Sequence, residues 1–79
     1  MKQIRKKILP KYLKEVWSGN KNFELRKDED DIQVGDELIL EEWVPETGYT
    51  GVIANRVVTY VLRNVPEYGL MDGYCIIGF

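Results

Sequence analysis

The sequence of 79 residues contains no histidine, a single cysteine and only three prolines. Without histidine, a serine–histidine or cysteine–histidine catalytic pair cannot form, and no metal can be held by imidazole. The lone Cys75 excludes an intramolecular disulfide framework and a cysteine-based zinc site. No glycine-rich phosphate loop or dinucleotide-binding fingerprint is present either. These absences remove several common enzyme classes, and we expect a protein with no metal and no cofactor.

The chain also lacks a long hydrophobic run. Its basic N-terminal segment reaches only Ile8 and Leu9 before Pro10, which is too short for the hydrophobic region of a secretory signal or for a membrane span. A single cysteine is in keeping with a reducing compartment. We therefore expect a cytoplasmic protein that has no membrane partner.

The residues that are present are typical of one small folded domain. Hydrophobic residues make up 44% of the sequence and charged residues 30%, a balance that separates it from disordered chains. A chain of this length can bury one modest core and has no room for a second. We therefore expect a single domain over residues 1–79.

Charge is unevenly distributed along the chain, although the net charge is only −2. Residues 1–27 hold nine basic and two acidic side chains, which gives a net charge of +7. Residues 28–79 hold two basic and eleven acidic side chains, which gives −9. This asymmetry indicates a charged partner.

Hydrophobic periodicity predicts a mostly β chain with one short early helix, which is the α+β class. Pro10 suits the first turn of a helix and Gly19 its end, so the helix is predicted near residues 10–18. The helical spacing predicts that Leu13 and Trp17 are buried. Strands are expected over residues 2–8, 21–27, 37–43, 52–63 and 74–79, with loops over 28–31, 44–50 and 64–73.

A small antiparallel barrel is the most economical arrangement of so few strands. Closing a sheet into a barrel removes exposed strand edges, which a sandwich of this size would leave open. The lysine-rich segment over residues 2–8 would be an edge strand, and the helix would cover one mouth of the barrel.

The strand over residues 21–27 is the most informative segment, because its charges alternate directly after the end of the helix. If this strand is half-buried, either Lys21 or the pair Glu24 and Arg26 must point toward the interior or a cleft. Glu24 and Arg26 lie two residues apart and can form an ion pair on one face. The alternative is a solvated strand face whose ion pair contributes about 1 kcal/mol or less.

The spacing Gly19-x-Lys21-x-x-Glu24-x-Arg26 resembles the GxKxxExR signature of ASCH domains, which are members of the PUA-like β-barrel superfamily. Over about residues 8–79 the chain is similar to a compact ASCH-like family of uncharacterised bacterial and phage proteins. The further motifs that carry this resemblance follow in order: Arg26-Lys27, Gly35-Asp36, Leu38-x-Leu40, Glu42-Trp43, Tyr49-Thr50-Gly51, Val58-Thr59-Tyr60, Gly69-Leu70 and Asp72-Gly73-Tyr74.

The resemblance implies a PUA-like barrel of five to six strands, with a helix beside a cleft that Lys21, Glu24 and Arg26 line. ASCH and PUA-like domains are associated with RNA binding or with handling a nucleotide base. Lys21, Arg26 and Lys27 would then contact phosphate, while Glu24 would accept hydrogen bonds from a base or hold Arg26 in place.

Aromatic residues are the expected stacking partners for a base. Trp43, Tyr49 or Tyr74 would each offer a ring face worth about 1–3 kcal/mol per base. For Trp43 and Tyr74 the alternative is a structural position in the core or at the barrel rim. The basic residues Lys2 to Lys7 would either form a phosphate-contacting arm or remain a solvated terminus.

Three functions remain open at this point. The first is a module that binds RNA or a nucleotide-like ligand, provided that the acidic residues lie away from the binding face. The second is an interaction or accessory factor with a protein partner. The third is an amidohydrolase acting on an N4-acylated cytidine, with Lys21 as the base; here Glu24 occupies the position where the resemblance expects threonine, and only Glu67 is left as the later carboxylate.

Overall fold

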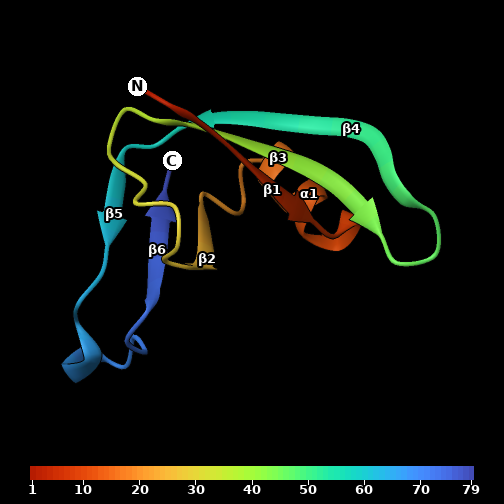
Figure 1. The fold of residues 1–79 in the computed structure, drawn as a ribbon. Coiled ribbons are helices and arrows are strands. Elements are labelled where there is room, and N and C mark those ends of the chain that lie inside the picture. The colour runs from red at the N-terminus through yellow and green to blue at the C-terminus, as the bar shows by residue number, and fades with distance from the viewer.

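Two three-stranded sheets and one α-helix make up the fold of the computed structural model, which describes residues 1–79 (Figure 1). The predicted mostly β chain with one early helix is confirmed. The elements in chain order are β1 (Gln3–Ile8), α1 (Pro10–Trp17), β2 (Phe23–Lys27), β3 (Glu37–Val44), β4 (Gly48–Val57), β5 (Tyr60–Leu62), the 3₁₀ helix η1 (Pro66–Tyr68) and β6 (Tyr74–Gly78). No helix has the length and apolar character needed to cross a membrane.

The strands do not close into the antiparallel barrel predicted above. One sheet has the order β1-β3-β4 and the other the order β2-β6-β5. Moreover, β1 pairs with β3 in parallel, with Gln3 opposite Glu37 and Ile8 opposite Glu42. A parallel pair requires a long crossover connection, which α1, β2 and the acidic loop supply here. The prediction that every strand pair is antiparallel is therefore wrong at β1.

Helix α1 begins and ends within one residue of the prediction. Pro10 occupies its first turn, and Gly19 lies just beyond its end with φ at +84°, a left-handed conformation that glycine adopts without steric cost. Leu13 and Val16 are buried in the core, as their three-residue spacing requires. Trp17, however, is 61% exposed, so its predicted burial is wrong: it lies about 100° around the helix from Val16, on the side that faces solvent.

The hairpin between β3 and β4 is tighter than predicted. Strand β4 already begins at Gly48, so only residues 45–47 connect the two strands and the predicted loop over 44–50 is too long. A register shift between Glu41 and Trp43 marks a bulge in this pair. The predicted single strand over 52–63 is broken at Val58 and Thr59, where the chain passes from one sheet to the other.

The core lies between the inner faces of the two sheets and α1. Leu38 and Leu40 of β3 are completely buried, and Cys75 and Ile77 contribute from β6. Eleven buried residues form this single cluster. Burial of each large aliphatic side chain contributes about 1.5–3 kcal/mol to folding.

Candidate functional site

A cleft lies where the open edges of the two sheets approach each other, between the end of β1 with the start of α1 and strand β2. Its volume is about 510 Å³. Nine residues line it: Lys7, Ile8, Leu9, Tyr12, Lys21, Phe23, Glu24, Leu25 and Arg26. Lys21, Glu24 and Arg26, which the signature predicted to converge on a cleft, are therefore brought together.

Strand β1 leaves one backbone edge unpaired toward this cleft. The carbonyl of Lys2 accepts a hydrogen bond from the Glu37 N–H, so this residue directs its backbone groups toward β3. Because backbone groups alternate along a strand, Gln3, Arg5 and Lys7 direct theirs to the opposite edge. No strand pairs with that edge.

Strand β2 has the complementary arrangement. The Asn22 carbonyl and the Asp28 N–H bond to residues that flank β6, so the intervening even-numbered residues face β6. Phe23, Leu25 and Lys27 consequently direct their backbone groups to the open edge. The cleft is thus a seam between two open strand edges, with no backbone pairing across it.

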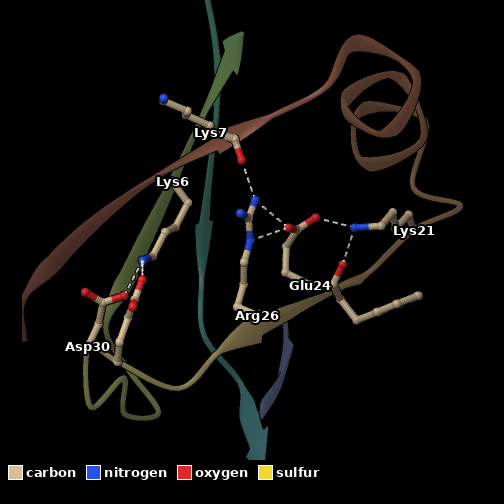
Figure 2. Close-up of polar contacts among 8 residues, drawn as sticks. Lys6, Lys7, Lys21, Glu24, Arg26 and Asp30 are labelled. Carbon is tan, nitrogen blue, oxygen red and sulfur yellow. Dashed lines mark hydrogen bonds and ion pairs between the residues drawn. The ribbon is translucent and has the colours of Figure 1, made fainter. Parts of the chain in front are cut away.

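Glu24 stands at the centre of the cleft, and its side chain is only 6% exposed (Figure 2). One carboxylate oxygen, Oε1, accepts a hydrogen bond from Lys21 Nζ. The other, Oε2, accepts from Arg26 Nε at 2.9 Å and lies 2.8 Å from Arg26 Nη2. A buried carboxylate with both oxygens paired in this way is a fixed feature of the site rather than a solvated surface charge.

The two cations also satisfy carbonyl groups of the open edges. Arg26 Nη2 donates to the Lys7 carbonyl of β1, and Lys21 Nζ donates to the Phe23 carbonyl of β2 at 2.7 Å. Figure 2 shows the Lys7 carbonyl directed at Arg26, while the Lys7 side chain extends away from the cluster. The three signature side chains therefore link the two sheets across the seam that the backbones leave open.

Hydrogen-bond donors remain available after these contacts are counted. Arg26 engages Nε and Nη2, which leaves both N–H groups of Nη1 without a partner in the protein. Lys21 uses two of its three N–H groups. Both side chains are partly exposed, at 25% for Arg26 and 18% for Lys21. The cleft thus presents three free donors and a formal charge of +1.

The walls of the cleft are apolar and aromatic. Tyr12 and Phe23 are about half exposed, and the Lys21 ammonium lies 5.8 Å and 5.0 Å from their ring centroids. Leu25 is 57% exposed on the same side of β2. Apolar walls around a few convergent polar groups are the usual composition of a site for a small organic ligand.

Three of the predicted site residues lie outside the cleft. Lys27 is exposed, and Tyr74 lies directly opposite it in the β2–β6 pair. Trp43 of β3 lies opposite Tyr49, and the Lys7 ammonium is 4.5 Å from its ring centroid. None of the three lines the cleft with Lys21, Glu24 and Arg26.

Sequence reasoning missed several residues of the cleft wall. Tyr12 was not predicted to line a site, yet it is 45% exposed at the cleft. Phe23 and Leu25 carried a usable signal, because strand alternation places them on one face with Lys21. Nothing in the sequence around Lys7 could have indicated that its carbonyl accepts a hydrogen bond from Arg26, because this contact depends on how β1 approaches β2.

The acidic segment that follows β2 is tied to basic residues of β1. Lys6 Nζ lies 2.5 Å from Asp30 and 3.4 Å from Glu29, and the hydrogen bond to Asp30 raises the pKa of Lys6. Arg5 pairs with Glu41 at 3.6 Å on the outer face of the sheet. The basic and acidic parts of the sequence therefore partly neutralise each other in space.

A second ion pair holds the acidic segment to the other sheet. Arg63 donates from Nε to Asp28 at 2.6 Å and from Nη2 to the Ile32 carbonyl at 2.9 Å; the Asp28 hydrogen bond raises the pKa of Arg63. Cys75 is buried nearby, and this burial raises the pKa of its thiol. These contacts are structural and lie outside the cleft.

The fold and the site define a small α+β domain with a polar cleft between two sheet edges. The chain belongs to the family described as a domain of unknown function, DUF3850, whose model matches residues 5–79. No curated protein matches the chain significantly. The match extends from β1 through β6 and includes every residue that lines the cleft.

Proposed function

We propose that the cleft binds a nucleotide-like ligand, either a free nucleotide or one nucleotide of a single-stranded RNA. The observation that carries this proposal is the convergence of Lys21, Glu24 and Arg26 on one cleft with three donors left free. Phosphate oxygens are strong acceptors of such hydrogen bonds. In this proposal the phosphate contacts Arg26 Nη1 and the remaining N–H of Lys21.

The charge of the cleft supports a ligand with a single negative charge at the point of contact. Glu24 neutralises one of the two cations, so the cluster carries +1 rather than +2. A phosphodiester carries one negative charge and would neutralise the cluster without leaving an excess. Glu24, whose two oxygens are both engaged, has the role of orienting the cations rather than reading a base.

The walls support the binding of a base beside the phosphate. Tyr12 and Phe23 expose ring surface within a cavity of about 510 Å³, a volume in the range of sites for small organic ligands, about 300–1,000 Å³. Stacking of one base on such a ring contributes about 1–3 kcal/mol. A duplex, whose bases are stacked inside, would present only its backbone to so narrow a seam.

We also propose that the chain is related to ASCH domains and has an open form of their PUA-like fold. Its support is that the spaced residues Lys21, Glu24 and Arg26 form one contiguous cluster beside a helix. In this interpretation the two sheets correspond to an open version of a PUA-like barrel, with the seam as ligand site.

The two alternatives receive less support from the geometry. For the amidohydrolase, Lys21 Nζ would have to accept a proton, but here it donates to Glu24 and Phe23, and the cleft lining contains no serine, threonine or cysteine. One observation favours the interaction factor. The contacts of Arg26 with Glu24 and with the Lys7 carbonyl join β1 to β2 without any ligand, so the cluster has a structural role that requires no binding function.

Binding measurements on charge-removing variants test the proposal. Replacing Lys21 by methionine keeps an unbranched apolar stem against Tyr12 and Phe23 while removing the donor. We expect Lys21→Met to weaken the affinity for a short single-stranded RNA or a mononucleotide roughly 10- to 100-fold, because a hydrogen bond to a charged group contributes about 1.5–3 kcal/mol. The measurement is fluorescence anisotropy or calorimetry at low salt.

The matched control is Lys27→Met, which removes the same charge at the end of β2, outside the cleft. It should change the affinity less than about threefold, within the range of a screened surface charge. Equal losses in the two variants would indicate nonspecific attraction and contradict the proposal. So would the absence of binding to any nucleotide or RNA by the folded wild-type protein.

A further inference from the structure

Three of the four sheet edges are protected against pairing with another strand. The open edge of β1 carries the basic run Arg5, Lys6 and Lys7, a common protection of edge strands. The open edge of β2 is capped at the Phe23 carbonyl by the side chain of Lys21, and Arg26 links this strand to the Lys7 carbonyl of β1. The third edge strand, β5, has only three residues, which is too short to support a stable pair.

The fourth edge, β4, has none of these protections. It is the longest strand, with ten residues, contains no proline and carries a single charge, on Arg56. Figure 1 shows β4 along the outer margin of its sheet with no strand beyond it. An exposed, long and nearly uncharged edge is the kind of strand that pairs with another chain.

The backbone groups that would form such a pair can be identified. Glu37 directs its N–H to β1, so its neighbour Leu38 directs its backbone to β4, where it lies opposite Arg56. Arg56 therefore faces β3, and the alternate residues Ile53, Asn55 and Val57 direct their N–H and carbonyl groups to the open edge.

Apolar side chains accompany these unpaired groups. Tyr49, Val52, Ile53 and Val57 of β4 are each more than 40% exposed. Beside them, Trp17 of α1 and Val52 line a second hollow of about 490 Å³. Tryptophan at a partly exposed position is enriched among the residues that dominate protein interfaces. The edge thus offers both backbone pairing and apolar burial.

We propose that β4 pairs antiparallel with β4 of a second copy of this chain, about a two-fold axis. Antiparallel self-pairing gives each copy the same contact surface, which is the arrangement of most homodimers. The single charge of β4 favours a second copy of this chain as the partner, because two β4 strands can pair without placing rows of like charge opposite each other. The same pairing through β1 would bring Arg5, Lys6 and Lys7 against their equivalents.

The dimer would contain one continuous sheet in the order β1-β3-β4-β4-β3-β1. Because β1 and β4 are the opposite edges of their sheet, the two clefts would lie at its far ends and remain open. This inference does not depend on the proposed ligand. One added strand pair is a small interface compared with the roughly 1,200–2,000 Å² of stable complexes, so the dimer should dissociate on dilution.

Analytical ultracentrifugation between about 1 µM and about 1 mM tests the pairing, a range that covers binding free energies of about −8 to −4 kcal/mol. We expect the mass to rise from that of one chain, 9.2 kDa, toward twice that value. The double variant Ile53→Lys/Val57→Lys should remain monomeric, since lysines would then face each other across the pair. It should fold, because both positions lie opposite glutamates, Glu41 and Glu37.

Two further variants make the result specific. Asn55→Pro removes an outward N–H and leaves the backbone hydrogen bonds to β3 in place, although it loses the side-chain hydrogen bond from Asn55 Nδ2 to Glu37 Oε2; it should also prevent dimerisation. Val34→Lys adds a lysine at an equally exposed valine outside β4 and should dimerise like the wild type. Amide hydrogen exchange should show dilution-dependent protection at Ile53, Asn55 and Val57 and unchanged protection at Arg56.

Three outcomes would overturn the proposal. The first is a wild-type protein that stays monomeric throughout the concentration range. The second is a dimer that persists in both the double lysine variant and Asn55→Pro. The third is a monomer whose β4 amides become protected only when an unrelated extended peptide is added, which would assign the edge to a different partner.

Discussion

Glu24 is the residue on which the arrangement of the cleft depends. Its carboxylate is almost fully buried, and the hydrogen bonds of Lys21 and Arg26 to its two oxygens fix both side chains in place. Removing one member of a buried ionic cluster leaves the remaining charges without compensation. The same residue therefore contributes both to folding and to the proposed binding surface.

Replacing Glu24 by glutamine tests this dual role. Glutamine retains the shape but loses the charge, and one of its two terminal groups becomes a donor that faces a cation. We expect Glu24→Gln to lower the free energy of unfolding by about 1.5–3 kcal/mol, as measured by urea denaturation. A change below about 0.5 kcal/mol would show that the cluster behaves as a solvated surface network.

At the same scale, the sequence predicted the position of some residues of the cleft and the core but not of others. The signature resemblance predicted that Lys21, Glu24 and Arg26 converge, whereas strand alternation alone places Lys21 on the face opposite the other two. Tyr12 and the Lys7 carbonyl were not predicted, since their position depends on contacts between segments far apart in the sequence. Trp17 was assigned to the core from helical spacing, but a two-turn helix buries only a narrow stripe, which Leu13 and Val16 occupy.

Among the elements, local patterns predicted where strands and the helix occur better than how they pair. The helix has a proline start and a glycine end, and both are encoded within a few residues. The parallel pairing of β1 with β3 depends on the path of the crossover, and no local pattern encodes it. The break at Val58 and Thr59 was missed for a related reason, because a β-rich run continues through it.

Asp36 connects two elements and gives the fold a dependence on pH. Its carboxylate accepts hydrogen bonds from the Lys2 N–H at 3.0 Å, before β1, and from the Gln33 N–H at 2.8 Å, before β3. These two bonds lower the pKa of Asp36 below its ordinary value. The carboxylate thus holds the start of β1 to the turn that precedes β3.

The sign of the effect follows from the lowered pKa. A carboxyl group with a lower pKa in the folded state stabilises the fold above its unfolded pKa of about 3.9 and loses that contribution as the pH falls further. We expect the wild type to lose stability below about pH 4 more steeply than Asp36→Asn, which should be less stable at neutral pH. Parallel pH profiles of the two proteins in thermal melts would contradict this assignment.

For the whole molecule, pairing between distant charges changes the meaning of the sequence asymmetry. The sequence divides into parts of +7 and −9, yet Lys6 pairs with Asp30 and Arg5 with Glu41 in the folded chain. Other basic side chains, such as Lys11, Lys14 and Lys27, form no ion pair and lie outside the cleft, where the cluster itself carries +1. The account therefore predicts a weak dependence of binding on salt, with a slope of about −0.7 for each phosphate engaged on a single strand.

The two-sheet architecture explains why the cleft lies where it does. Open edges of β1 and β2 face each other across the seam, and side chains rather than backbone pairs join them. The opposite edge, β4, is free for the self-association proposed above. Ligand binding and self-association thus concern opposite sides of one molecule, and each can be measured without the other.

Mapping of ligand binding onto the wild-type protein shows, without any substitution, whether the cleft is the binding site. Isotope-labelled protein is titrated with mononucleotides and a short single-stranded RNA, and the NMR shifts of each residue are followed. The account predicts concentration-dependent shifts at Tyr12, Lys21 and Phe23 and at the Arg26 guanidinium, with small changes at Lys27 and Tyr74. Shifts centred on Lys27, Tyr74 or Trp43, or no shifts with any of these ligands, would contradict it.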